Sequence, residues 1–459
     1  MSRTLCILSA LFATVLIPVQ AFADGGTDND SSPYSKFGIG MLSRKGSAFQ
    51  HSMGGVGTAT RDNRHINTLN PAAVTARDSL AFMGDFGVAQ KNTYASQGSS
   101  KSVYNTFNIN NFVMSFPIWR SSAFMVGIAP FSSVGYDIVQ RVKEPGLIGV
   151  TGNITDTYTG DGSIYNLYVG AGVTFWKRLS LGAQLDYYFG NLTKDYYRTF
   201  ESSSYRTLYS GSNMYIRGIG GKLGIQYEET IAKQNKITLG ATYRFKTNLY
   251  AENEFVNHAV QSELIDTLAC LTSDKAFDIA DGTNTSKKKY SQSVDFAGNK
   301  VNIPWEASVG ISYKWKDVFR VEADYTISDW TGSNMDKVIG LRTGSFAPSV
   351  LHSGNLGFEY TPNRSDIRYF FKRCTYRVGA YYTQENYMVS GYPISTAGVT
   401  LGMSVPVFRW LNNISFAIDF GQRGALFTPS GSGLITERFV NFAVSMNIFD
   451  IWFVKPRYE

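Results

Sequence analysis

The sequence repeats one pattern from residue 79 to its end: segments of about ten residues in which apolar side chains alternate with glycine, polar or charged ones. The clearest segment carries apolar side chains at five alternate positions, Ile237, Leu239, Ala241, Tyr243 and Phe245. A period of two gives a strand with one apolar and one polar face. About 14 such segments follow one another, so the pattern predicts an all-β fold.

The composition favours a membrane barrel over a chain of soluble domains. Charged residues make up only 17% of the chain, against about 25% in soluble proteins, and aromatic residues reach 14%. Mean hydropathy is nevertheless slightly negative, at -0.14. Beyond residue 23 no run of 18 apolar residues occurs, which excludes a protein that crosses a membrane with helices.

The connections after even-numbered segments are shorter than those after odd-numbered segments. Short turns follow the even segments, at residues 119–121, 176–178, 315–317 and 409–411. Longer connections are expected after odd segments, at residues 91–103, 140–161, 196–212, 251–302, 331–350 and 421–436. This sorting is typical of outer-membrane barrels, whose short turns are periplasmic. We therefore predict a transmembrane antiparallel β-barrel of about 14 strands over residues 79–459, with both termini periplasmic.

Tryptophan supports the same placement, because all seven tryptophans fall at predicted strand ends. Their amphipathic rings favour the level of the lipid headgroups. The alternative is a soluble β-protein whose strands are capped by tryptophan. Five of the seven are expected at periplasmic ends and two at outer ends: Trp119, Trp176, Trp315, Trp410 and Trp452, against Trp305 and Trp330.

The first 23 residues have the features of a signal peptide. Arg3 precedes an apolar run, and Ala21-Phe22-Ala23 supplies the small residues of a cleavage site. Export leaves Cys270 and Cys374, two residues from which no disulfide framework can be derived. The formal net charge of +7 comes without a basic helix or a zinc-ligand spacing, so no nucleic-acid partner is expected.

Residues 24–78 do not alternate and are rich in glycine and small polar residues. A barrel of about 14 strands has a lumen too wide for its own side chains to fill. We therefore expect this segment to form a plug, or hatch, inside the barrel, with a disordered periplasmic linker as the alternative. Asn70-Pro71 favours a turn before a short helix that begins with proline.

The glycine-rich segment, the tripeptide Asn70, Pro71 and Ala72, and the strand count together resemble the FadL-type family of outer-membrane transporters for long-chain fatty acids and other hydrophobic compounds. The resemblance covers nearly the whole mature chain and points to a divergent branch. It implies that the segment is a hatch to which the Asn-Pro-Ala motif belongs. Some FadL-like barrels are instead non-transporting subunits of secretion or barrel-assembly machinery.

Pro130 lies near the middle of the third predicted strand, and proline cannot donate a hydrogen bond to a neighbouring strand. A bulge or kink is therefore expected there. In the FadL family the third strand carries a kink that opens a lateral passage, so the resemblance makes Pro130, Ser132 and Ser133 a possible lateral gate. The alternative is that Pro130 lies above the membrane.

Charged residues on the polar faces of the strands are expected to point into the lumen and to pair with one another: Asp186, Lys222, Arg244, Lys246, Arg320, Glu322, Asp324, Glu359, Arg377 and Asp419. A carboxylate ligand would need an uncompensated cation beside an apolar pocket. Arg244 and Arg377 are the candidates for such a ligand partner.

The predicted outer loop 251–302 contains an amphipathic stretch, residues 255–279, followed by Lys287-Lys288-Lys289. Such a loop suits capture of a hydrophobic ligand or docking of a partner, and the lysines suit lipopolysaccharide phosphates, although a solvated loop is the commoner meaning. The four histidines show no metal-ligand spacing, and no nucleophile or phosphate-binding motif stands out. We expect no enzyme, catalytic residue, metal or cofactor; His352 is the one candidate for a barrel-resident hydrolase.

Two functions remain open. The first is passive uptake of hydrophobic small molecules through a pocket in the lumen and a lateral opening in the wall. The second is a sealed barrel that serves as a subunit of an outer-membrane secretion or barrel-assembly complex. The expected partners are outer-membrane lipid and lipopolysaccharide, a hydrophobic ligand, and other outer-membrane proteins or lipoproteins.

Overall fold

The computed structural model describes residues 32–77, 81–119, 121–142, 144–202, 204–205, 207–231, 234–260, 301–337, 345–407, 412–427 and 433–451. The predicted signal peptide, Cys270 and the run Lys287-Lys288-Lys289 lie outside these residues, as do Trp410 and Trp452.

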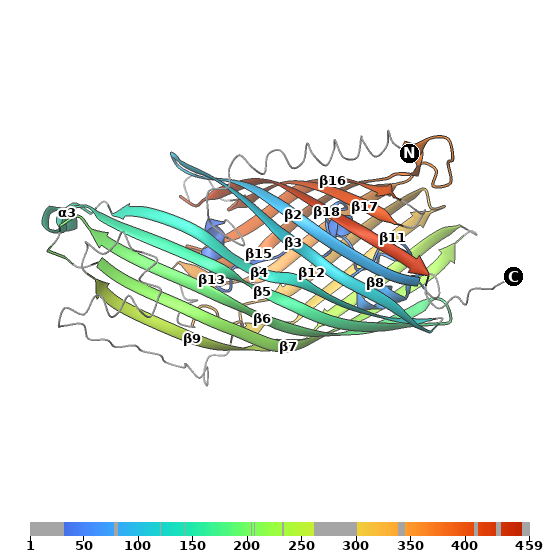
Figure 1. Ribbon diagram of the computed structural model, residues 1–459, viewed down its shortest axis with the longest axis horizontal. Coiled ribbons are helices and arrows are strands. Elements are labelled where there is room, and N and C mark those ends of the chain that lie inside the picture. Colours follow the sequence, from blue (N-terminus) through green and yellow to red (C-terminus); the bar gives the residue numbers. More distant parts are fainter. Residues whose placement is uncertain are drawn as a thin grey trace.

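One antiparallel sheet closes on itself, because its last strand pairs with the first strand of the wall over their whole length (Figure 1). Three wall strands are interrupted once, as β8 with β9, β10 with β11 and β13 with β14. Counting each of these pairs once gives the 14 strands expected from the sequence. The strands are β2 (Ala81–Gln97), β3 (Ser100–Trp119), β4 (Ser122–Val142), β5 (Ile154–Phe175), β6 (Leu179–Phe200), β7 (Thr207–Ile231), β8 (Asn235–Arg244), β9 (Thr247–Val260), β10 (Asn302–Ile303), β11 (Glu306–Trp315), β12 (Phe319–Asp329), β13 (Phe346–Pro348), β14 (Val350–Tyr360), β15 (Thr375–Val389), β16 (Tyr392–Pro406), β17 (Asn413–Gly424) and β18 (Thr436–Ile451).

Tight turns join the strands at one end of the barrel, which we call the short-turn end. Phe175 pairs with Leu179, and Trp315 pairs with Phe319, so three residues connect each pair of strands. Trp176 and Lys177 have φ of 48° and 62°, the left-handed conformation that matches the twist of the flanking strands. The tenth wall strand differs, because residues 361–374 follow it and contain the short helix α6 (Phe370–Arg373).

The opposite end carries the helix α3 (Pro145–Thr151). Three segments that were predicted as loops at this end contain strand residues. Residues 91–103 are strand, closed by a hairpin in which Gln97 pairs with Ser100. Half of residues 140–161 and most of residues 196–212 also belong to strands, and β5, β6 and β7 run for 22, 22 and 25 residues. Strands this long continue beyond the thickness of a membrane, where both faces are polar, and such a sequence is easily taken for a loop.

The outward face of the wall is apolar at alternate positions, as in Leu181, Leu185 and Tyr187 of β6, each at least 40% exposed. Trp119 and Trp176 are 77% and 83% exposed at the short-turn end, as predicted for a membrane girdle. Trp330 contradicts the prediction, because it is 1% exposed and packs inside the barrel. The described helices are all too short or too polar to cross a membrane.

Residues 32–77 form an N-terminal segment that lies within the barrel (Figure 1). Its elements are η2 (Pro33–Lys36), β1 (Met41–Leu42), α2 (Ala48–His51) and η3 (Pro71–Thr75). They contact strands on different sides of the wall: η2 contacts β4, α2 contacts β16, β17 and β18, and η3 contacts β4 to β7. The segment therefore bridges the lumen.

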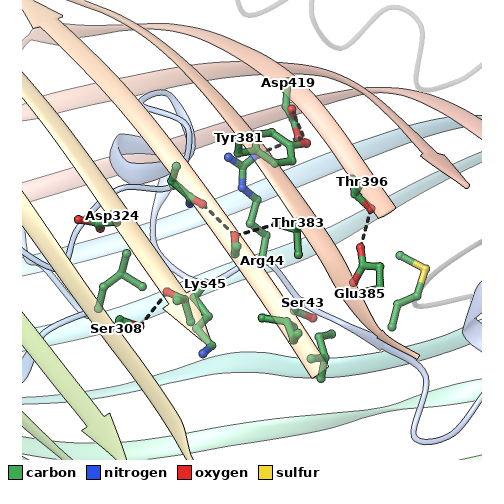
Figure 2. A pocket seen from close by; sticks show the side chains of 18 of the residues that line it. Ser43, Arg44, Lys45, Ser308, Asp324, Tyr381, Thr383, Glu385, Thr396 and Asp419 are labelled. Carbon is green, nitrogen blue, oxygen red and sulfur yellow. Dashed lines mark hydrogen bonds and ion pairs between the residues drawn. The ribbon is translucent and has the colours of Figure 1, made fainter. Parts of the chain in front are cut away.

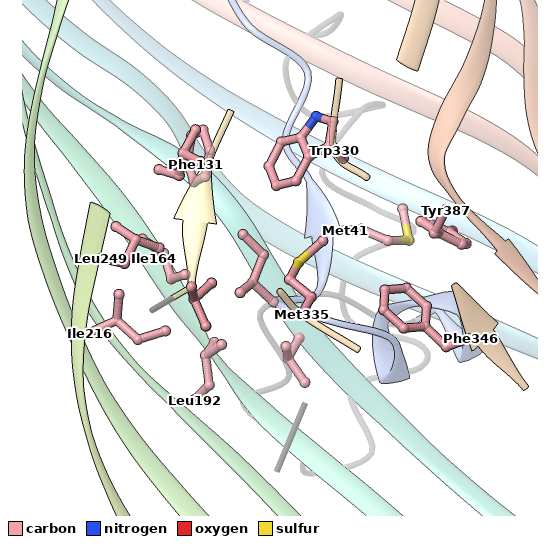
Figure 3. Close-up of a cluster of buried hydrophobic side chains, with 14 of the residues drawn as sticks. Met41, Phe131, Ile164, Leu192, Ile216, Leu249, Trp330, Met335, Phe346 and Tyr387 are labelled. Carbon is pink, nitrogen blue, oxygen red and sulfur yellow. The ribbon is translucent and has the colours of Figure 1, made fainter. Parts of the chain in front are cut away.

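An apolar cluster fills the lumen toward the α3 end (Figure 3). The N-terminal segment contributes Tyr34, Ile39 and Met41, and the wall contributes side chains from several strands. Trp330 and Met335, which follow β12, complete the cluster and are each 1% exposed. The interior at this level is packed side chain against side chain, as in the core of a soluble domain.

Candidate functional site

The pairing between β3 and β4 stops partway along the wall. It runs from Trp119 with Ser122 to Phe112 with Ile128. At about 3.3 Å per residue and a tilt of about 40°, seven residues place this point about 18 Å above the short-turn end, inside an apolar band of about 25 Å. Beyond it the described part of β3 pairs with β2 and that of β4 with β5, and the two strands diverge (Figure 1).

A bulge lies on each side of this break. In β3 the extra residue is Asn110, because Gly87 pairs with Asn111 and Val88 with Ile109. In β4 the extra residue is Phe131, between Pro130 and Ser132. The bulge expected at Pro130 is therefore confirmed. No sequence feature predicted the bulge at Asn110.

Beyond its bulge, β4 stays paired with β5 but is buried on both faces over six residues. All six residues from 131 to 136 are buried, and Ser132 and Val134 are both 0% exposed. A strand within a membrane wall exposes every second side chain to lipid, so burial on both faces shows that this stretch bends into the lumen. Phe131 enters the apolar cluster, where its ring meets that of Tyr188 edge-on at 4.9 Å.

The N-terminal segment lies along this inward stretch of β4 and bonds to it through the backbone. In β1, Met41 pairs with Ser133 and Leu42 with Ser132, and Ser43 N donates to Phe131 O at 2.9 Å. Gly40, with φ of 89°, passes so close that a Cβ atom would lie 2.3 Å from Ser133 O. Pro130, Ser132 and Ser133 are thus brought together, and the N-terminal segment covers the two serines.

The tripeptide at Asn70 has the predicted local structure. Pro71 begins η3, and the Asn70 side chain caps it by accepting from Ala72 N at 3.0 Å. Asn70 Nδ2 donates back to Thr58 O at 2.8 Å. Glycines of the wall make room for this turn, because a Cβ atom on Gly182 would lie 2.3 Å from the carbonyl carbon of Pro71.

A buried ion cluster fixes the N-terminal segment near the short-turn end. Arg320 Nη2 lies 2.8 Å from Glu359 Oε2 and 3.3 Å from Asp62 Oδ2, and Arg377 Nε lies 2.8 Å from the same Glu359 oxygen. Thr60 donates a hydrogen bond to Glu322. The segment supplies Asp62 and Thr60 and the wall supplies the other groups, so the cluster joins the two.

The second candidate arginine, Arg244, is also compensated. Its Nη2 lies 3.1 Å from Glu306 Oε2, and Lys45 of the N-terminal segment pairs with the other oxygen of Glu306. Pairing within the lumen is thus confirmed for Arg244 and Arg377, and neither meets the condition of an uncompensated cation. Lys246 departs from the expectation: it is exposed, because the strand breaks between β8 and β9 and the alternation changes phase there.

A cavity of about 250 Å³ remains between the N-terminal segment and the wall (Figure 2). It is lined by charged side chains such as Arg44, Lys45, Asp324 and Asp419, by hydroxyl groups such as Thr383, and by apolar side chains such as Leu69, Leu351 and Phe439. Arg44 Nη1 pairs with Asp419 Oδ2 at 3.0 Å, and the guanidinium lies 4.0 Å from the centre of the Tyr381 ring. A hydrocarbon in this cavity would lie against charged groups as well as apolar ones, which costs free energy wherever a charge loses water.

His352, the candidate for a barrel-resident hydrolase, lies on β14. His352 Nδ1 lies 2.8 Å from the hydroxyl group of Tyr325. Across the described ranges, no three histidine, cysteine, aspartate or glutamate side chains are grouped as a metal site requires. Cys374 is buried at the end of the α6 turn and forms no disulfide within the part of the chain that the structure covers.

The closed 14-stranded barrel is shared with solved outer-membrane structures. A FadL homologue of Pseudomonas aeruginosa superimposes with a TM-score of 0.56 at 11% identity, over 90% of this chain and 99% of that one. The toluene transporter TbuX of Ralstonia pickettii gives 0.52 at 17% identity, over 88% and 98%. TodX of Pseudomonas putida, also a toluene transporter, gives 0.52 at 14% identity, over 89% and 98%. The protein is a barrel of the FadL-like fold class.

A comparison with curated protein sequences gives no match. A family model named BamG matches residues 1–459, the whole chain. The chain belongs to the BamG family.

Proposed function

We propose that this protein is a sealed FadL-like barrel of the outer membrane that serves as a non-transporting subunit of a barrel-assembly complex. In this placement the short-turn end and both termini face the periplasm, and the α3 end faces outward. The inward stretch of β4 carries the proposal. At the level where a lateral passage would open, residues 131–136 are fully covered, and the N-terminal segment bonds to their backbone.

Two further observations support a sealed lumen. The apolar cluster packs side chains of the N-terminal segment against those of several wall strands, and ion pairs such as Arg44 with Asp419 line part of the cavity below it. Moving a hydrocarbon through that cavity would place it against charged groups that have already lost most of their water. The match of the whole chain to the BamG family is a further support for the subunit function.

Passive uptake of hydrophobic small molecules is the second candidate. It is favoured by the break between β3 and β4, which lies within the apolar band of the wall, and by the fold shared with the toluene transporters TbuX and TodX. In this case Pro130, Ser132 and Ser133 would form a lateral gate and residues 32–43 its closing element.

Affinity purification of the tagged full chain from native outer membranes separates the two. The subunit function predicts one or more outer-membrane proteins or lipoproteins at stoichiometric amounts, identified by mass spectrometry. It also predicts that liposomes containing the purified barrel take up a fluorescent fatty acid no faster than empty liposomes. A barrel that purifies alone and accelerates uptake would reverse the assignment.

A further inference from the structure

The turn after the tenth wall strand, residues 361–374, is unlike the tight turns beside it. It contains four basic residues and one acidic residue, Asp366. Three of its large apolar or aromatic side chains are turned to solvent: Ile367 is 91% exposed, Tyr369 50% and Phe371 70%. Apolar side chains this exposed at the end of a packed barrel mark a surface that is covered in the working protein.

The turn is internally ordered. The Asp366 carboxylate accepts from the backbone amides of Arg368 and Tyr369 at 2.9 and 2.6 Å. The cations of Arg368 and Lys372 lie 5.5 and 4.6 Å from the centre of the Tyr369 ring. Basic groups and aromatic rings are therefore held together on one element, in a combination typical of membrane-interface segments.

The position of α6 continues the lipid-facing surface. The Tyr376 hydroxyl donates to Phe371 O at 3.0 Å. Tyr376 of β15 pairs with Tyr360 of the neighbouring strand β14, which is 42% exposed on the outward face. Phe371 thus lies against the outward side of the wall at the edge of its apolar band. Arg364, by contrast, turns to the lumen side, 3.7 Å from Glu359.

We propose that residues 367–373 bind anionic phospholipid of the inner leaflet, with Ile367 and Phe371 inserted at the level of the acyl chains and Arg368 and Lys372 at the phosphates. The charge of the turn complements an anionic headgroup, and its position is continuous with the membrane-facing wall. This lipid site shares with the proposed function only the placement of the short-turn end in the periplasm.

The test uses the full-length barrel in detergent with mixed phosphatidylcholine and phosphatidylglycerol, followed by native mass spectrometry of the lipids that stay bound. We expect the wild type to enrich phosphatidylglycerol over phosphatidylcholine. The double variant Arg368→Gln, Lys372→Gln should reduce this enrichment by roughly tenfold or more, as the loss of two basic groups at a membrane surface predicts. The matched control is Lys177→Gln, Arg178→Gln, which removes two basic groups from a tight turn at the same end and should keep the enrichment.

Equal enrichment in the wild type and the double variant would overturn the proposal, as would an equal loss in the control. If lipid enrichment is unchanged and the double variant, purified from native outer membranes, loses a protein that the wild type retains, the proposal is overturned and the turn is a protein-docking surface. Since lipid retention is measured on the isolated barrel, it is independent of whether the subunit function holds.

Discussion

Asn110 and Phe131, the extra residues of the two bulges beside the β3–β4 break, both bond to the same short stretch of the N-terminal segment. Asn110 Nδ2 donates to Gly46 O at 3.0 Å, and Phe131 O accepts from Ser43 N at 2.9 Å. Each bulge redirects one residue from the wall toward the lumen. Residues 43–46 therefore hold the two sides of the break in fixed positions, so release of the segment and movement of the wall should be coupled.

Replacing Asn110 by leucine removes one of these two bonds. A hydrogen bond of this kind contributes about 0.5–1.5 kcal/mol, so the released form of the N-terminal segment should become roughly twofold to twelvefold more populated. Tryptic cleavage after Arg44 or Lys45 in the folded barrel, mapped by mass spectrometry, reports that release. Asn92→Leu is the control, because the Asn92 side chain bonds to Val440 of the wall at 2.9 Å; equal cleavage in both variants would refute the coupling.

Gly182→Ala should displace η3 from the wall. The added Cβ atom would lie 2.3 Å from the Pro71 carbonyl carbon and 2.4 Å from Ala72 N, which are backbone atoms that cannot rotate away. Hydrogen exchange of residues 70–76 should rise while the strands stay protected. Gly84→Ala, where the new methyl group meets nothing within 4 Å, should leave exchange unchanged. Unaltered protection in Gly182→Ala would show that η3 does not dock as described.

Arg320→Met should strongly destabilise the barrel. Arg320 is 1% exposed and faces Glu359, Glu322 and Asp62. Its removal leaves the buried Glu322 and Asp62 without their arginine, whereas Glu359 keeps Arg377. Breaking a buried pair in this way costs about 3–5 kcal/mol. The temperature at which the folded band disappears on a semi-native gel should fall clearly. Arg178→Met, which breaks a pair whose arginine is largely exposed, should change it little; equal effects would argue against a structural role for the cluster.

The alternation of residues such as Leu239 and Tyr243 was sufficient to predict the strand count, because lipid on one side and a polar lumen on the other impose a period of two. The same reasoning failed for side chains that are buried inside the lumen instead of facing lipid. Trp330 and residues 131–136 are buried because a kinked strand and the N-terminal segment meet inside the lumen. That meeting depends on contacts between residues far apart in sequence, which no local pattern records.

The charged residues of the candidate site were predicted as a set, but their partners were not. The side of the strand on which Arg320 and Glu359 lie follows from periodicity. The identity of the groups that complete the cluster depends on how residues 57–65 fold. These residues show neither the period of two of a strand nor the period of 3.6 of a helix. Asn110 and Ser43 carried no sequence signal for the same reason, since their roles arise from backbone atoms of distant residues.

Two buried histidines make attachment of the N-terminal segment depend on pH. Burial, and next the Arg44 cation, lower the pKa of His51 from 6.5 to about 3. Burial also lowers the pKa of His65, which stacks on Phe49 at 4.3 Å. Both must stay neutral in the docked state, whereas the released state takes up protons below pH 6.5. Docking is therefore fully stable above pH 6.5 and weakens as pH falls toward 3, by up to about 1.4 kcal/mol per pH unit for His51, with a further loss in the same direction from His65.

Hydrogen exchange of residues 48–56, corrected for the intrinsic pH dependence of exchange, measures this loss between pH 7 and pH 4. Protection in the wild type should fall steeply below pH 6.5. In His51→Gln the released state no longer takes up the proton of His51, so the fall in protection per pH unit should be smaller by a factor of up to about ten. The double variant His51→Gln, His65→Gln should lose most of the pH dependence that is left. His352→Gln is the matched control, since His352 lies on β14 and pairs with Tyr325, and its slope should equal that of the wild type. A double variant with the wild-type slope would place the pH dependence on other groups.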